Sequence, residues 1–240
     1  MSATEAFHFY QGTTLFKKRL SGPINPSERD ALFFSSLLLS IVTFYYVDAC
    51  TPEEAWPLKP SSALDLNWIA MTNGKAEIWR VTKTAGRVPS VFDNLPKDNL
   101  VTFAPSPSLE ALPPSFIALF GLDDPTSSPA TNPYHFTATA LAQFLPIACP
   151  ETTLLAFISY TADIDSGIRR LLHMKDARAL LLIAYWYALV CQMRIWWISK
   201  RTAIECQAIC LYLERYHSQN STIQELLRFP QQMCENGVIG

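Results

Sequence analysis

The sequence predicts an all-α protein, a single-domain helical bundle with buried central helices and a Pro-rich, poorly regular middle segment. Apolar residues recur at helical spacing in one segment after another, and no alternating run bounded by turn signals predicts a hairpin. The chain has 240 residues, 49% of them hydrophobic, which suits one domain with a large core. The chain has only 8 Gly but 17 Pro, and so few glycines disfavour a fold that depends on glycine-rich phosphate loops.

Two helices are predicted at the start of the chain. Apolar residues between Ala6 and Leu20 form an amphipathic segment, which Ser21-Gly22-Pro23 ends. The stretch Asn25-Pro26-Ser27-Glu28 then supplies an N-cap, a proline at the first helical position and a carboxylate at the third. We therefore expect a second helix over residues 31–47.

A Pro-rich loop over residues 51–62 precedes a third helix, for which Asp65 is the expected N-cap and Gly86 the expected stop. Residues 87–132 are a Pro-rich excursion from the single domain 1–240, because nine prolines between positions 89 and 133 leave room only for short helices such as Ser115–Leu122. Such a run is typical of a lid, an excursion or a segment that orders on binding.

Helical patterns resume after the excursion. Asn132-Pro133 again supplies a cap and a first-position proline, and further helices are predicted over residues 152–160 and 166–174. A long helix over 177–198 and another over 201–216 follow. The last predicted helix is Ser221–Arg228, which we expect to end before Pro230.

Charge and cysteine spacing exclude several functions. Nineteen Lys and Arg against 21 Asp and Glu give a formal charge of −2, so we expect no direct nucleic-acid binding by this chain. The six cysteines are scattered, mostly in apolar stretches, as in intracellular proteins with reduced thiols. Cys206, Cys210 and His217 share a helix face, but about 10 Å of helix separates Cys210 from His217, too far for one zinc ion. We expect no metal and no cofactor.

Two apolar segments bear on membrane insertion. Residues 31–47 contain no charge, yet 17 residues is the lower limit for a bilayer span. Ser36, Ser40 and Thr43 form a polar seam on this segment, which is typical of a helix packed among neighbours. Residues 179–193 are shorter still, and the first 20 residues lack the charge order of a secretory signal. We therefore expect no membrane span.

Catalytic motifs are missing from the sequence. There is no nucleophile elbow, Walker loop, dinucleotide fingerprint or H-E-x-x-H, and no spacing pairs any of the four histidines with an acid. We therefore expect a protein that is not an enzyme. Aromatic residues do concentrate on three predicted helices, where they serve mainly as core but can also wall a pocket for an apolar ligand.

Four segments of the chain resemble a known family. They are, in order, DALFFSSLLLSIVTFYY, LNWIAMTNGKAEIW, RRLLHMKDARALLLIAYWYALVCQMRIWWISKRTAIECQAI and LLRFPQQM. This pattern is similar to the C-terminal regulatory domain of fungal binuclear zinc-cluster (Zn2Cys6) transcription factors of the sterol-uptake-control type. The resemblance runs from Thr4 to Met233, and the Pro-rich middle matches poorly. None of the six cysteines has the C-x2-C spacing of the N-terminal zinc cluster, so we expect a truncated or stand-alone regulatory domain without it.

The resemblance implies a transcription regulator that senses a sterol or another lipid, or that controls a secondary-metabolite gene cluster. It implies a place in the nucleus, or entry from the cytoplasm on activation, and partners that include an apolar ligand and either a second copy or a coactivator. The expected ligand-wall residues lie in the middle of the matching helices, with ordinary core packing as the other interpretation of each: Phe34, Trp68, Trp79, Tyr185 and Trp186.

Two other functions remain open at this point. A ligand-free dimerisation scaffold would use the helix over residues 201–216 as its interface. A biosynthetic enzyme would require a polar cleft in which His135 or His173 meets an acid.

Overall fold

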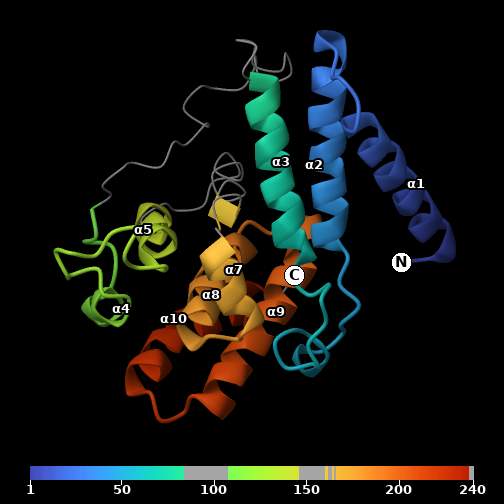
Figure 1. Ribbon diagram of the computed structural model, residues 1–240. Helices are drawn as coiled ribbons and strands as arrows, with labels where there is room; N and C mark the ends of the chain where they lie inside the picture. Colours follow the sequence, from blue (N-terminus) through green and yellow to red (C-terminus); the bar gives the residue numbers. More distant parts are fainter. Residues whose placement is uncertain (84–107, 146–159, 162–163, 165, 238–240) are drawn as a thin grey trace.

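The computed structural model describes residues 1–83, 108–145, 160–161, 164 and 166–237. Every regular element in these ranges is a helix, which confirms the all-α prediction (Figure 1). The elements are α1 (Ala3–Leu20), η1 (Pro26–Glu28), α2 (Arg29–Tyr45), η2 (Pro52–Glu54), α3 (Asn67–Lys83), α4 (Pro114–Leu119), α5 (His135–Phe144), α7 (Ser166–His173), α8 (Ala177–Cys191), α9 (Trp196–Tyr216) and α10 (Ser221–Gly237).

Helix α8 is the centre of the core. All residues from Ala179 to Cys191 are buried, because α9 and α10 pack against this helix and α5 and α7 also contact it (Figure 1). A helix that is apolar on every side must be covered on every side. The predicted central helix is therefore present, with the Asp176 side chain accepting hydrogen bonds at its N-terminus.

The predicted helix over 177–198 is wrong at its C-terminal end. The chain leaves α8 at Cys191 and turns before α9 begins at Trp196, with Arg194 in the left-handed region at φ 50°. Gln192 and Arg194 are both exposed, whereas a continued helix would run past the core. The turn instead brings Ile198 back into the core.

Helix α10 also differs from the prediction, because it continues through Pro230 to Gly237. A proline has no backbone N–H, so the Leu226 carbonyl loses its usual partner within the helix. The Tyr185 hydroxyl donates a hydrogen bond to that carbonyl at 3.1 Å. A side chain of the neighbouring helix thus satisfies the group that the proline leaves unpaired.

Helices α2 and α3 lie side by side above the core (Figure 1). The predicted second helix is present as α2, which begins at Arg29, two residues before the predicted start, and ends at Tyr45. The predicted cap Asn25 and Pro26 instead open η1, the short 3-10 helix that precedes it. Ser36 and Ser40 of the polar seam are buried, and the Ser40 hydroxyl donates to the Met71 carbonyl of α3 at 3.3 Å. Within the described ranges, no helix has the length and apolar character needed to cross a bilayer.

Part of the Pro-rich excursion belongs to the core. Leu112, Phe116 and Phe120 are buried around α4, and the Phe116 ring lies 5.2 Å from the Tyr185 ring. This helix confirms the short element predicted near 115–122. Residues 84–107 of the excursion, the expected stop at Gly86 and most of the predicted 152–160 helix lie outside the described residues.

Two expected caps have other partners. The Asp65 carboxylate accepts from the Ser62 N–H at 2.6 Å and pairs with Lys59 at 2.8 Å, two residues before α3 begins. The Asn132 side chain accepts from the Tyr134 N–H at 3.0 Å and donates to the Phe120 carbonyl at 2.7 Å, three residues before α5 begins. Both side chains therefore stabilise the preceding loops.

Candidate functional site

Two of the expected ligand-wall residues lie in a stack of aromatic rings. Trp186 is stacked with Trp68, at 5.5 Å and an interplanar angle of 11°, and with Tyr160, at 6.3 Å and 14°. The Phe44 ring makes T-shaped contacts with both tryptophans, at 5.2 and 6.0 Å. Side chains of the chain itself thus surround Trp186, which is the geometry of core packing.

The other three expected wall residues are not part of this stack. Tyr185 lines a separate hollow of about 380 Å³ together with Phe229 and residues near α4. Phe34 is half-buried on α2, 5.7 Å from the Phe33 ring. Trp79 belongs to α3, but its side chain lies outside the described residues. The structure therefore brings Trp68 and Trp186 together and leaves Phe34 and Tyr185 apart from them.

A larger hollow lies between α1 and α2. It has a volume of about 710 Å³ and takes its walls from the first half of α1 and the last turns of α2. Leu38, Val42 and Tyr45 of α2 follow one another at helical spacing along it and are all exposed, Leu38 by 61%. Its lining is Met1, Thr4, Glu5, His8, Phe9, Leu38, Leu39, Val42, Tyr45, Tyr46, Val47, Asp48 and Lys200.

A second hollow of about 490 Å³ continues along the same two helices. It shares Leu38 and Leu39 with the first and extends past Gly12 and Phe16 to Arg19. The positions that α1 contributes to the two hollows recur every three or four residues, so they form one stripe of that helix. We call the two hollows together the α1–α2 groove.

Charged residues gather at one end of the α1–α2 groove. Glu5 and Asp48 are both acidic, and Lys200 is the basic residue of the lining. The Tyr46 hydroxyl donates to Asp48, and this hydrogen bond raises the pKa of Tyr46. The Lys200 ammonium donates to the Val47 carbonyl at 3.0 Å. The groove thus combines an apolar floor with a polar end that holds both acidic and basic groups.

Helix α1 is the loosely held wall of the groove. None of its residues is buried, and its main packing partner is α2, from which it splays outward (Figure 1). At its N-terminus Ser2 and Glu5 form a capping box. At its C-terminus the Arg19 guanidinium donates to both carboxylate oxygens of Glu28 and to the Pro23 carbonyl at 2.9 Å. The capping box is internal to α1, so among these contacts those of Arg19 with Glu28 and Pro23 are the ones that position the helix.

The Arg19–Glu28 pair makes the attachment of α1 sensitive to acid. The Arg19 side chain is the main cause that lowers the Glu28 pKa from 4.5 to about 2. Because the folded pKa lies below the unfolded one, the contribution of the pair to stability is complete above pH 4.5 and is lost as pH falls through 2. In an NMR titration of the Glu28 carboxyl carbon, we expect a pKa near 2 in the unaltered chain and a higher pKa in Arg19→Gln, because the main lowering cause is removed. The same pKa in both would contradict the pair.

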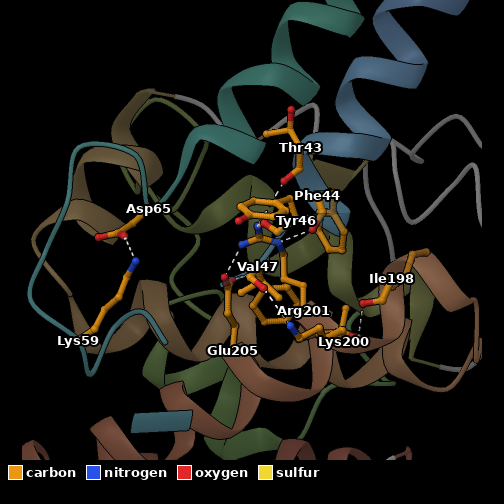
Figure 2. A network of polar contacts seen from close by, with 12 residues as sticks. Thr43, Phe44, Tyr46, Val47, Lys59, Asp65, Ile198, Lys200, Arg201 and Glu205 are labelled. Atoms are coloured by element: carbon orange, nitrogen blue, oxygen red, sulfur yellow. Dashed lines mark hydrogen bonds and ion pairs between the residues drawn. The ribbon is translucent and has the colours of Figure 1, made fainter. Parts of the chain in front are cut away.

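A buried polar network holds α2, the other wall, in place (Figure 2). Arg201 of α9 donates to the carbonyls of Phe44 at 2.6 Å, Tyr46 at 2.6 Å and Thr43 at 3.3 Å. These carbonyls lie at the end of α2, where helical partners run out. Arg201 also pairs with Glu205, one turn further along α9. A single side chain therefore fixes the end of α2 to the core.

The Glu205 carboxylate completes the network. It accepts hydrogen bonds from Arg201 and from the Tyr187 hydroxyl of α8. Burial raises the pKa of Glu205, although the Arg201 charge opposes that shift. Arg201, Glu205 and Tyr187 are all buried. The pair is thus satisfied inside the core, and removal of either partner would leave the other charge uncompensated.

Sequence reasoning missed the groove because a contact between two helices has no local motif. One available signal was the weak amphipathicity of α1, where Phe7, Tyr10 and Leu15 are all exposed. Most of the exposed large apolar side chains in the described ranges lie on α1, on α2 or at the start of α9. The 201–216 helix, predicted above as the interface of a dimerisation scaffold, lies within α9 and contributes one side to the core.

The described residues offer little for metal or acid–base chemistry. Among them no group of three or more His, Cys, Asp or Glu is placed to hold a metal ion. Burial lowers the pKa of His135, whose buried Nδ1 has no hydrogen-bond partner, and His173 is exposed. No ion pair in the described ranges joins either histidine to an acid.

Comparison with known proteins gives no match: no family model, no curated protein and no solved structure is significantly similar to this chain.

Proposed function

We propose that this chain is the regulatory domain of a transcription regulator of the zinc-cluster type, and that it senses a neutral apolar molecule carrying a hydroxyl, such as a sterol, in the α1–α2 groove. One observation supports this most: a hollow of about 710 Å³ with an apolar floor and a polar end. Small-molecule sites typically measure about 300–1,000 Å³ and have this make-up. The site differs from the predicted aromatic wall, whose tryptophans contact each other.

The polar end of the groove holds groups of both charge signs. Glu5 and Asp48 are acidic, whereas Lys200 and the Met1 terminal ammonium are basic. A hydroxyl both donates and accepts, which matches an end that holds the acidic Asp48 and the basic Lys200. A sterol, with its apolar body and single hydroxyl, therefore fits the groove.

The loose packing of α1 supplies a means of signalling. An isolated helix of 18 residues is marginal in water, and α1 buries none of its residues. A ligand in the groove adds apolar contacts to α1 as well as to α2, so it favours the docked position of α1 over a released one. Occupancy would thus change the surface that the domain presents to a coactivator.

Ligand-induced stabilisation tests the proposal. Saturating ergosterol should raise the melting temperature of the purified chain, because a ligand bound only by the folded state adds about 2.7 kcal/mol of stability at 100 times its Kd. Val42→Trp, which fills the groove from its floor, should abolish the sterol shift. Leu64→Trp is the matched control, since Leu64 is 70% exposed and lies outside the groove.

The outcomes separate the alternatives. The same shift in Val42→Trp and in the unaltered chain would place the ligand elsewhere. Absence of any shift, together with a dimer in light scattering, would favour the ligand-free scaffold. Fused to a heterologous DNA-binding domain, the unaltered chain should make a reporter respond to sterol supply, and Val42→Trp should remove that response.

A further inference from the structure

A serine stands at the C-terminal end of α1, just after a run of basic residues. Lys17, Lys18 and Arg19 lie in the last turn of the helix, and Ser21 is its C-cap. Ser21, Lys17 and Lys18 are all exposed. Positive charges thus stand two, three and four residues before this serine. A protein kinase with an acidic substrate cleft selects such a serine by charge complementarity.

The Ser21 hydroxyl is open to modification. It donates to the Lys17 carbonyl at 3.0 Å, and the Ser21 N–H donates to the same carbonyl at 3.2 Å. Carbonyls in the last turn of a helix have no partner further along it, so they take such capping bonds. Because the backbone N–H caps this carbonyl as well, the hydroxyl can be modified without leaving the carbonyl unpaired.

The side chain that anchors α1 lies beside the same turn. The Arg19 guanidinium donates to the Glu28 carboxylate and, through Nη1, to the Pro23 carbonyl at 2.9 Å. The same nitrogen is 3.8 Å from the point that a Cβ on Gly22 would occupy. The guanidinium therefore passes close to the residue that follows Ser21, so a phosphate on Ser21 would lie near its positive charge.

We propose that Ser21 is the phosphorylation site of a protein kinase that selects basic segments, and that the phosphate draws Arg19 away from Glu28 and loosens the docking of α1 on α2. A phosphoserine carries a charge of about −1.5 to −2 at pH 7 and three acceptor oxygens, more than a carboxylate offers to a guanidinium. It would also stand at the negative end of the α1 dipole, where an added anion destabilises the helix.

The transfer needs two co-reactants, the kinase and ATP. The Ser21 oxygen attacks the γ-phosphorus, the bond from that phosphorus to the β–γ bridging oxygen breaks, and ADP leaves. The hydroxyl proton passes to the catalytic aspartate of the kinase. The last turn of α1 must open for the kinase to bind it, and this is easy because α1 buries none of its residues and helix ends open readily.

One consequence reaches the α1–α2 groove, because loosening of α1 would displace one of its walls. This consequence alone rests on the proposed ligand site. The phosphorylation itself depends on the contacts at the end of α1, and its test uses no sterol. Failure of one proposal is therefore distinguishable from failure of the other.

The first part of the test maps the phosphate. The folded, intact chain is incubated with ATP and the catalytic subunit of the cyclic-AMP-dependent protein kinase, and the modified residues are identified by mass spectrometry. We expect phosphate mainly on Ser21. Ser27 is the internal control, because it is also exposed but follows no basic residue within four positions, and it should stay unmodified. Lys18→Ala should slow the reaction at Ser21 severalfold.

The second part measures the docking of α1 by hydrogen exchange. Amides of α1 should exchange roughly fivefold faster in the phosphorylated chain, because loss of an ion pair and an anion at the helix end both lower its local stability. The pKa of Glu28 should rise, because Arg19 is the main cause that lowers it. Ser21→Glu should show part of both changes, whereas the uncharged Ser21→Gln, of similar size, should show neither.

Two results would overturn the proposal. One is a folded chain that takes no phosphate on Ser21, whether or not the unfolded chain accepts it. The other is a chain phosphorylated on Ser21 whose α1 exchange and Glu28 pKa do not change. Both readouts use the unaltered sequence, so a variant that fails to fold does not affect the decision.

Discussion

Arg201→Met is expected to lower the free energy of unfolding by about 3–5 kcal/mol, the cost of breaking a buried ion pair from one side. The change removes the donor to three carbonyls at the end of α2 and leaves the Glu205 carboxylate in the core without its cation. The loss should shrink as pH falls, because protonation of Glu205 removes the unpaired charge. Urea denaturation at two pH values measures both effects.

Lys200→Met is the matched control. Lys200 precedes Arg201 on the same helix and also donates to a carbonyl, that of Val47, but it is exposed (Figure 2). Its removal should change stability by no more than about 0.5 kcal/mol. An equal loss of unfolding free energy in the two variants would contradict the claim that the buried Arg201 network stabilises the fold more than an exposed hydrogen bond does.

The double variant Arg201→Met with Glu205→Leu separates the charge pair from the carbonyl contacts. Without the acid no charge is left unpaired, so part of the lost stability should return. The loss of unfolding free energy that remains in the double variant comes from the α2 carbonyls, which lack their donor, and from the Tyr187 hydroxyl, which lacks its acceptor. A double variant as unstable as Arg201→Met would contradict the ion-pair account.

Trp186→Ala should lower the free energy of unfolding by a similar amount, about 3–5 kcal/mol, because it removes a large buried ring and leaves a cavity. Trp186 is 3% exposed, and its ring is stacked with those of Trp68 and Tyr160. Chemical denaturation measures the change. Trp196→Ala is the control of the same residue type, since Trp196 is 74% exposed, and it should cost about 0.5 kcal/mol or less.

This variant also distinguishes the two interpretations of the aromatic residues. If Trp186 is core, ergosterol should still raise the melting temperature of the folded variant. If Trp186→Ala loses little stability but no longer binds the sterol, the predicted aromatic wall would instead be the ligand site.

Local signals in the sequence were enough to predict most helices. Ser21-Gly22-Pro23 ended the first helix and Asn25 with Pro26 opened η1 just before the second, because caps and prolines act within a few residues. The errors arose where packing decided the outcome. The turn at Arg194 returns the chain to the core, and Tyr185 satisfies the carbonyl that Pro230 leaves free. Tyr185 is far in the sequence from the carbonyl that it satisfies, and the core to which the chain returns after Arg194 is built by other helices.

The candidate site was less predictable than the fold. Aromatic residues in the middle of helices suggested a pocket, but ring clusters and pockets have the same composition in a sequence. Trp68 and Trp186 proved to stack on each other, whereas the groove depends on how α1 crosses α2. The Arg19–Glu28 pair holds the end of α1 beside the start of α2, and Arg201 holds the other end of α2 to the core. No periodicity in the sequence encodes these contacts.

Photoaffinity labelling tests the sterol site most directly. A sterol that carries a diazirine is irradiated with the folded chain, and the labelled residues are mapped by mass spectrometry with and without excess ergosterol. We predict label on α1 between Thr4 and Phe16 and on α2 between Leu38 and Tyr46, and we predict that ergosterol removes it. Label concentrated at Tyr185 and Phe229, or label that ergosterol leaves unchanged, would contradict binding in the α1–α2 groove.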